Sequence, residues 1–175
     1  METLIDVKQL LSGESDRLEF ELTVPPESMG RFPDVTFSQP FTLRGKITNR
    51  AGYMHLTLDT TIPYETFCAR CLTPLSISYP LHLDKTVAEA SALEDADSDE
   101  VVSDYILTEN GKFDVVGAVA EQMMLELPLR HLCRSDCQGL CSLCGHNKNE
   151  GDCGCRREIV NPQFAALRDQ WNRDK

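Results

Sequence analysis

The sequence has no long hydrophobic run and no recognisable export signal. No apolar stretch approaches the ~20 residues that a helix needs to cross a bilayer, so we expect no membrane span. The first residues have neither the basic segment nor the apolar segment of a secretory signal, which predicts a cytoplasmic protein. In that reducing compartment, clustered cysteines are more often metal ligands or catalytic groups than disulfides.

Basic residues are scarce in the centre of the chain. The 175 residues have a net charge of −11; residues 84–127 contain 2 basic and 12 acidic side chains, whereas residues 128–175 contain 8 basic and 6 acidic ones. An acidic protein repels phosphate backbones at long range, which argues against non-specific nucleic-acid binding by the whole chain. The mildly basic C-terminal part remains a candidate for RNA contact, and the acidic centre for contact with a basic protein.

The motifs of common enzymes are also missing. The sequence contains no nucleophile elbow, no phosphate-binding glycine loop and no pair of histidines at metalloprotease spacing. The acidic run 94–100 has no apolar surroundings that would bury a catalytic carboxylate. We therefore expect a protein that is not an enzyme, and no small-molecule substrate is evident.

Alternating polar and apolar residues predict a β-rich domain over residues 1–128. The predicted strands cover residues 17–24, 41–48, 54–58, 62–68 and 75–83, with a hairpin turn at 49–52. Regular strands joined by short turns favour a mainly antiparallel sheet that is curved or forms a partial barrel.

The pattern changes after residue 89. Residues 89–104 are acidic with few large apolar groups, which predicts a loop. Residues 114–127 have helical periodicity with Asp114 as N-cap, and the motif Asn161-Pro162 begins a terminal helix. The expected fold class is α+β: a sheet domain with one packed helix (1–128), then a segment resembling a zinc knuckle and a terminal helix (129–175).

Eight cysteines are the strongest functional signal. Two form the pair Cys68-x2-Cys71, and six more lie within 23 residues, at Cys133, Cys137, Cys141, Cys144, Cys153 and Cys155. A structural zinc ion takes four ligands that commonly come as two short pairs. Cys141-x2-Cys144-Gly145 has the form of a knuckle, and Cys153-x-Cys155 can close that site.

The spacing leaves the pairing of the cysteines open. Eight thiolates fit two sites of four, the second of which joins Cys68 and Cys71 to Cys133 and Cys137; one site with unused cysteines fits equally well. Either His131 or His146 could replace a cysteine. The sequence therefore predicts one or two structural zinc ions.

Two rival chemistries use the same cysteines. Cys137-x3-Cys141-x2-Cys144 has the spacing of the iron–sulfur motif of radical enzymes, but here it lies late in a short, mainly β chain. Cys68-Ala69-Arg70-Cys71 could act as a redox pair, because an adjacent arginine lowers a thiol pKa. Thioredoxin-like pairs begin a helix, whereas this pair is followed by another predicted strand. A thiol-redox or iron–sulfur protein remains the alternative, and a zinc-dependent protein-interaction module is a weaker one.

The order of the motifs resembles one family. Cys68-Ala69-Arg70-Cys71-Leu72-Thr73-Pro74 follows a strand, Leu125-Glu126-Leu127-Pro128-Leu129 precedes the six clustered cysteines, and Asn161-Pro162-Gln163-Phe164 follows them. This combination, over roughly residues 40–171, resembles the YceD family of large ribosomal RNA subunit accumulation proteins. The resemblance implies a role in 23S ribosomal RNA accumulation and large-subunit assembly, through a ribosomal precursor, ribosomal RNA or a basic ribosomal protein.

Basic residues near the cysteines are the candidates for RNA contact. They are Arg130, Arg134, Lys148, Arg156 and Arg157.

Overall fold

The computed structural model describes residues 3–50, 53–90 and 105–155, which fall into two compact units. The first unit comprises residues 1–67 and 74–131, and the second comprises residues 68–73 and 132–175. The chain therefore leaves the first unit after Phe67, returns to it at Pro74, and enters the second unit again at Leu132.

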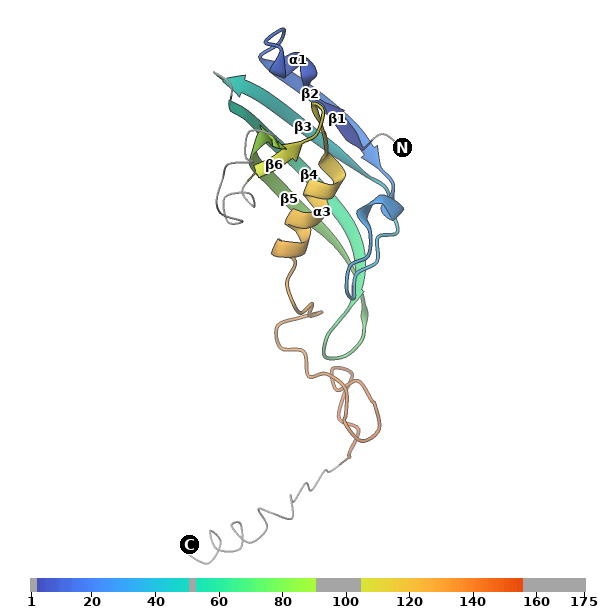
Figure 1. The fold of residues 1–175 in the computed structure, drawn as a ribbon. Coiled ribbons are helices and arrows are strands. Elements are labelled where there is room, and N and C mark those ends of the chain that lie inside the picture. Colours follow the sequence, from blue (N-terminus) through green and yellow to red (C-terminus); the bar gives the residue numbers. More distant parts are fainter. Residues whose placement is uncertain (1–2, 51–52, 91–104, 156–175) are drawn as a thin grey trace, which may run out of the picture. The chain divides into compact units, whose positions relative to one another are not determined.

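A five-stranded sheet forms the frame of the first unit (Figure 1). Its strands, in spatial order, are β2 (Arg17–Val24), β3 (Phe41–Arg50), β4 (Tyr53–Phe67), β5 (Pro74–Glu89) and β6 (Tyr105–Thr108). Strands β2 to β5 pair antiparallel, as the alternation predicts, whereas β6 lies parallel to β5. Within the described ranges the edge strands β2 and β6 do not pair with each other, so the sheet is open and not a closed barrel.

Strand β4 is longer than the sequence predicts. Two strands were expected over residues 54–68, separated by polar residues 59–61, but the structure has one strand from Tyr53 to Phe67. The predicted break is wrong because Thr60 continues the alternation: its hydroxyl donates a hydrogen bond of 2.9 Å to the Thr42 carbonyl of β3. Residues 51–52 of the predicted hairpin turn lie outside the described residues.

A second, two-stranded sheet leads into the main helix. Strand β1 (Leu4–Asp6) pairs antiparallel with β7 (Lys112–Asp114), which follows a turn at Asn110 and Gly111. Both turn residues have positive φ, 54° and 71°, the conformation that favours Asn-Gly in tight hairpins. Helix α3 (Val115–Glu126) begins directly after β7, and the Asp114 side chain accepts a 3.1 Å hydrogen bond from the Val116 N–H. This N-cap is the one that the sequence predicts.

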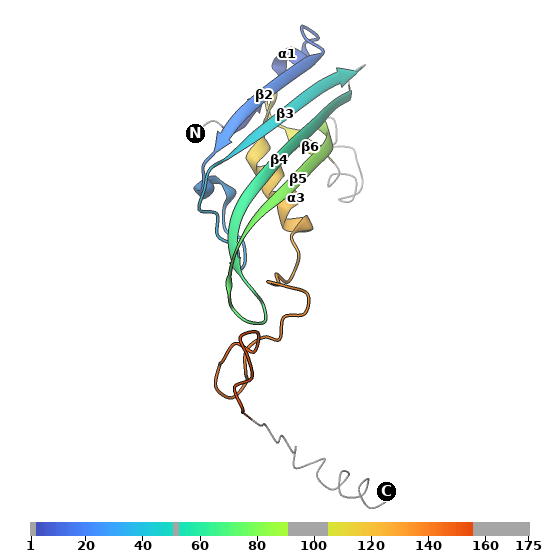
Figure 2. The ribbon, with the colours of Figure 1, turned by 180° about the vertical axis from the view of Figure 1, so that it is seen from behind.

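The core lies between α3 and one face of the large sheet. Helix α3 crosses the front of the sheet in Figure 1 and lies behind it in Figure 2. The helix buries Val115, Val119 and Met123. The short helix α1 (Lys8–Leu11) and the 3-10 turn η1 (Pro26–Met29) add Leu10 and Met29 to the same core. The large sheet contributes the buried side chains of Leu43, Ile47, Leu56, Leu58 and Leu83.

One residue of the predicted helix face lies elsewhere. Helical periodicity predicts that Val116 and Met124 both lie beside the stripe of Val115, Val119 and Met123; Val116 is buried, but Met124 is 58% exposed. Each helical residue turns by about 100°, which carries position 124 away from the line through 115, 119 and 123.

Two predicted features fall outside the description of the structure. Residues 91–104 of the acidic loop and the terminal helix from Asn161 onward are not among the described residues. In the ranges that are described, no helix has the length and apolar character needed to span a bilayer.

Candidate metal centres

The segment between β4 and β5 forms a tight turn that presents two cysteines. The Leu72 N–H donates to the Cys68 carbonyl at 2.9 Å, and the Cys68 N–H donates to the Thr73 carbonyl at 2.9 Å. Leu72 has a φ of 59°, so the backbone reverses immediately after the second cysteine. We call this turn, residues 68–73, the first knuckle.

Residues 141–146 form a second knuckle with the same hydrogen bonds. The Gly145 N–H donates to the Cys141 carbonyl at 2.9 Å, and the Cys141 N–H donates to the His146 carbonyl at 2.7 Å. Gly145 has a φ of 74° at the position that Leu72 occupies in the first knuckle. Two segments remote in sequence therefore adopt one local structure, and each supplies two sulfurs that lie within 4.8 Å of each other.

The first knuckle completes a set of four thiols with Cys133 and Cys137, which we call the inner cluster. All four sulfurs lie within 4.8 Å of one another; Cys68 Sγ is 3.8 Å from Cys137 Sγ, and Cys71 Sγ is 3.6 Å from Cys133 Sγ. Four thiolates around one zinc ion, at Zn–S distances of about 2.3 Å, stand about 3.8 Å apart in a tetrahedron. The cysteines are free thiols, and their separations are those of ligands that share a single ion.

The second knuckle completes a matching set with Cys153 and Cys155, the outer cluster. Its four sulfurs also lie within 4.8 Å of one another. The turn at Gly154, with a φ of 70° and an N–H that donates to Asp152 Oδ1 at 3.0 Å, lets both cysteines of this short motif face one point. The sequence left one site or two open, and the structure brings all eight cysteines into two groups of four that could hold metal ions.

Polar side chains surround the inner cluster. Asn149 Nδ2 donates to Cys137 Sγ at 3.3 Å, and the Thr73 hydroxyl lies 3.1 Å from Cys71 Sγ. The Arg70 guanidinium donates to the Cys137 carbonyl at 2.9 Å. A donor to a ligand sulfur, such as Asn149, orients the ligand and stabilises the charge on its thiolate, whereas Arg70 fixes the backbone beside Cys137. Sequence reasoning missed Asn149, because a single asparagine in a polar loop gives no signal of its spatial neighbours.

Backbone contacts join the first knuckle to the hairpin that carries the second. Leu140 and Asn147 form a β-bridge at the base of this hairpin, and the Leu140 N–H also donates to the Arg70 carbonyl at 3.1 Å. A Cβ on Gly139 would lie 3.0 Å from the same carbonyl, so glycine permits this close approach. The base is closed by Asn149 Oδ1, which accepts the Gln138 N–H at 2.8 Å and Arg134 Nη2 at 2.7 Å.

Within each cluster the thiol pKa values are shifted in opposite directions. Burial opposes ionisation of Cys68, but backbone N–H groups of Cys133, Cys71 and Arg70 outweigh it and lower the pKa of this thiol to about 6. Backbone N–H groups of Cys144 and Leu143 likewise lower the pKa of Cys141 to about 6. Hydrogen bonds with the neighbouring thiols raise the pKa of Cys155 to about 12. A divalent cation would supply the positive charge that lets all four thiols of a cluster ionise together.

Neither histidine replaces a cysteine. His131 Nε2 lies 2.9 Å from the Tyr64 hydroxyl in the first unit, and the backbone carbonyl of His146 closes the second knuckle. Both metal-ligand sets among the described residues consist of cysteines alone. The structure therefore gives no support to a histidine ligand, which the spacing had left open, and the two sets contain only the cysteines that the sequence predicts.

The iron–sulfur spacing does not form a single site. Cys137 belongs to the inner cluster, whereas Cys141 and Cys144 belong to the outer one, so the three do not converge. The Cys68–Cys71 pair lies in a turn between strands and shares its site with two further thiols, unlike a redox pair at a helix start.

The predicted RNA-contact residues do not form one group that the structure can define. Arg134 is held by Asp136 Oδ1 at 3.5 Å and by Asn149. Arg130 and Lys148 are exposed but belong to different units. Arg156 and Arg157 lie outside the described residues.

Comparison with known proteins places these features in a family. The sequence matches the family described as Large ribosomal RNA subunit accumulation protein YceD over residues 55–169, a range that contains both knuckles and all eight cysteines. The chain belongs to this family. The resemblance inferred from the order of motifs is thereby confirmed.

Individual relatives are mycobacterial proteins described as uncharacterized. One from Mycobacterium tuberculosis is 34% identical over 105 residues, which cover 57% of this chain and 47% of that protein. Another, from Mycobacterium leprae, is 28% identical over 135 residues, which cover 77% of this chain and 61% of that protein. The matched part of the chain thus spans about half the length of the first of these relatives. No solved structure matches the chain.

Proposed function

We propose that this protein is a non-enzymatic factor that supports 23S ribosomal RNA accumulation and large-subunit assembly, with two structural zinc ions in its second unit. The observation that carries the ribosomal part is membership of the YceD family over residues 55–169. The partner would be a large-subunit precursor, ribosomal RNA or a basic ribosomal protein, and the location would be the cytoplasm.

Zinc is favoured by the chemistry of the ligand sets. Two groups of four cysteines, each with its sulfurs within 4.8 Å of one another, suit zinc, which binds thiolates and commonly takes four protein ligands in structural sites. In structural zinc sites all four positions are taken by protein ligands, which leaves no open position for a substrate. The two all-cysteine sets therefore support a structural role over a catalytic one.

The second unit has no apolar core in its described part, which indicates why it would need metal. Within the described part of this unit, every buried side chain belongs to a cysteine: Cys68, Cys71, Cys137 and Cys141. Small units without an apolar core need metals or disulfides to fold. We infer that metal binding supplies the folding free energy of the second unit.

Depletion of the protein in its host tests the ribosomal role. Mature 23S ribosomal RNA and the large-subunit peak in sucrose gradients should both fall, and a copy of the wild-type gene should restore them. A copy with Cys68→Ser and Cys71→Ser should restore neither. Unchanged ribosomal RNA and subunit profiles after depletion would refute the ribosomal role, whatever metal the protein contains.

A further inference from the structure

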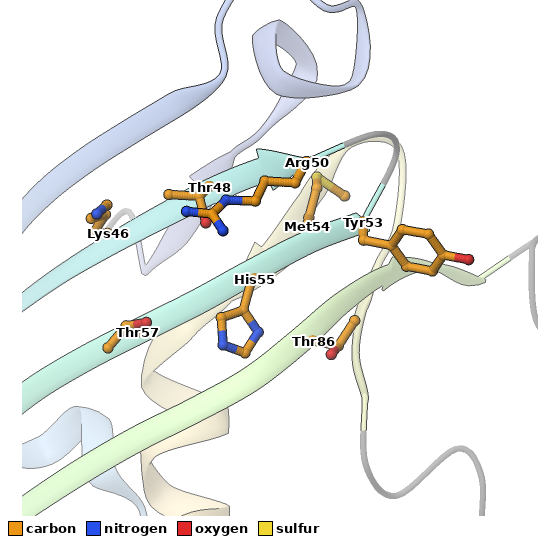
Figure 3. A pocket seen from close by; sticks show the side chains of 8 residues that line it. All are labelled: Lys46, Thr48, Arg50, Tyr53, Met54, His55, Thr57 and Thr86. Atoms are coloured by element: carbon orange, nitrogen blue, oxygen red, sulfur yellow. The ribbon is translucent and has the colours of Figure 1, made fainter.

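The face of the large sheet that points away from α3 carries a hollow at one end. It has a volume of about 440 Å³ and lies across β3, β4 and β5 (Figure 3). Its lining includes six polar side chains that could contact a ligand: Lys46, Thr48, Arg50, Tyr53, His55 and Thr86. None of these residues belongs to the metal centres or to the basic candidates near the cysteines.

Two cations of the hollow have no carboxylate partner among the described residues. Lys46 and Arg50 form no ion pair there, although other basic residues of the same face do: Arg17 binds Glu19, and Arg44 Nη2 lies 3.2 Å from Glu21 Oε1. Glu19 is the register partner of Lys46 but is engaged by Arg17. The hollow is therefore a locally positive spot on a protein of net charge −11.

A second carboxylate, on strand β5, is also engaged. Asp84 Oδ1 lies 2.6 Å from His55 Nε2, which is the imidazole between the two β3 cations and Thr86 in Figure 3. His82 and Asp59 form a second such pair further along the same strands, at 2.7 Å. These pairs engage both aspartates of β4 and β5, and neither aspartate forms an ion pair with Lys46 or Arg50.

An exposed aromatic ring borders the two cations. Tyr53 is the register partner of Arg50, and its side chain is 76% exposed. In Figure 3 the ring of Tyr53 projects away from the other labelled side chains. The hydroxyls of Thr48 and Thr86 also line the hollow, and each can donate or accept a hydrogen bond.

We propose that this hollow binds single-stranded RNA. Phosphates bind Lys46 and Arg50, one base stacks on Tyr53, and threonine hydroxyls contact the sugar or base edges. Sheet faces with exposed aromatic rings and cations recognise unstacked bases in this way. The strand rise of about 3.3 Å per residue puts the backbones of Lys46 and Arg50 about 13 Å apart, a span of a few nucleotides. This inference rests on the proposed ribosomal function, because that function brings RNA to the protein.

A duplex is the poorer ligand for this geometry. Double-stranded RNA is recognised by contacts spread over successive grooves and by its 2′-hydroxyl groups. The two free cations line one small hollow and the exposed Tyr53 ring stands at its edge, which fits a short unpaired segment.

Fluorescence anisotropy with a labelled single-stranded RNA of about 10 nucleotides tests the site directly. The probe is titrated with full-length, metal-loaded protein at several salt concentrations. Tyr53→Ala should weaken binding about 5- to 100-fold, and Tyr53→Phe should retain most of the affinity because the ring still stacks. Lys46→Ala and Arg50→Ala should each lower the slope of log affinity against log salt by about 0.7.

Control variants distinguish RNA binding at the hollow from RNA binding at other surfaces of the protein. Arg44→Ala removes a cation of the same face that is already paired, and Phe67→Ala removes a ring that is 63% exposed at the other end of β4; both should bind like wild type. Arg130→Ala and Lys148→Ala test the basic residues near the cysteines. The proposal is wrong if these two weaken binding while the hollow variants do not, if wild type does not bind at low salt, or if duplex RNA competes equally.

The outcome is separable from that of the ribosomal proposal. If depletion lowers 23S ribosomal RNA but the hollow variants bind RNA like wild type, the site is refuted and the function stands. If the hollow variants lose RNA binding but depletion leaves ribosomal RNA unchanged, the site stands and the function is refuted.

Discussion

The inner and outer clusters share a knuckle but differ in their surroundings. Three of the four inner cysteines are buried, whereas the outer cluster has one buried cysteine, Cys141. Asn149 and Thr73 contact inner sulfurs, and no such side-chain partner of an outer sulfur is found among the described residues. The same local turn thus occurs in the inner cluster, which is largely buried and has side-chain hydrogen-bond partners, and in the outer cluster, which is more exposed.

This difference suggests a hierarchy between the two sites. The hairpin that carries the second knuckle is anchored through the Leu140–Arg70 backbone bond and through Asn149, which also touches Cys137. Loss of the inner ion would release the base of this hairpin, whereas loss of the outer ion would leave the first knuckle and its contacts in place. We therefore expect the outer site to depend on the inner one, and not the reverse.

The largest expected effect is on the fold of the second unit. Cys68→Ser with Cys71→Ser removes half of the inner ligands, and structural zinc contributes about 10 kcal/mol or more to the folding of small metal-bound units. Hydrogen exchange with mass spectrometry should show loss of protection throughout residues 132–155, with α3 and the large sheet unchanged.

The matched double variant in the outer cluster is the control for this effect. Cys144→Ser with Cys155→Ser should lose protection at residues 141–155 but keep it at the first knuckle and at residues 133–138. Equal loss of protection in the two double variants would show that the clusters fold as equivalent partners.

Removal of metal by a chelator should occur in two steps. A chromophoric chelator mixed with wild-type protein should extract one ion quickly from the exposed outer cluster and one more slowly from the buried inner cluster. Cys144→Ser with Cys155→Ser should abolish the fast step alone. A single phase that releases both ions in wild type would contradict the difference in accessibility.

Asn149→Ala should weaken the inner site without removing a ligand. The side chain supplies a donor to Cys137 and accepts bonds that close the hairpin base, and loss of an outer-shell partner of this kind typically costs 10- to 100-fold in metal affinity. Competition titration against a zinc buffer measures the change. Ser142→Ala, an exposed residue between two outer ligands, is the control and should leave affinity unchanged.

The smallest effects concern the residue that follows the cysteine pair in each knuckle. Gly145→Ala places a Cβ in open space, so its cost arises from the positive φ alone and should be about 1–2 kcal/mol against the outer site. Leu72→Gly should be neutral or stabilising by up to about 1 kcal/mol, because Leu72 is 61% exposed and its φ of 59° suits glycine. Thermal unfolding of metal-loaded protein measures both, and destabilisation by Leu72→Gly comparable to that of Gly145→Ala would contradict the equivalence of the two turns.

Local features of the fold and site could be read from the sequence because they depend on neighbours in the chain. Alternation located β2, the Asp114 cap located α3, and the Cys-x2-Cys spacing located both knuckles. The continuity of β4 was missed because the role of Thr60 depends on a carbonyl of another strand.

Long-range features could not be read in this way. The partners of Cys68 and Cys71 follow 62 residues or more later, so spacing alone allowed several groupings, and proximity of the sulfurs separates them. Asn149, the Gly139–Arg70 contact and the hollow beside Tyr53 arise from the meeting of distant segments. Charge counts along the chain favoured the basic C-terminal part, whereas the free cations of the sheet emerge only once ion pairs have engaged their neighbours.

Metal content of anaerobically purified, full-length protein tests the central claim most directly. Elemental analysis and native mass spectrometry should find two zinc ions per wild-type chain, one in Cys144→Ser with Cys155→Ser, and none in Cys68→Ser with Cys71→Ser. Fewer than two metal ions in wild type, or retention of one ion by the inner variant, would contradict a pair of structural sites in which the inner supports the outer.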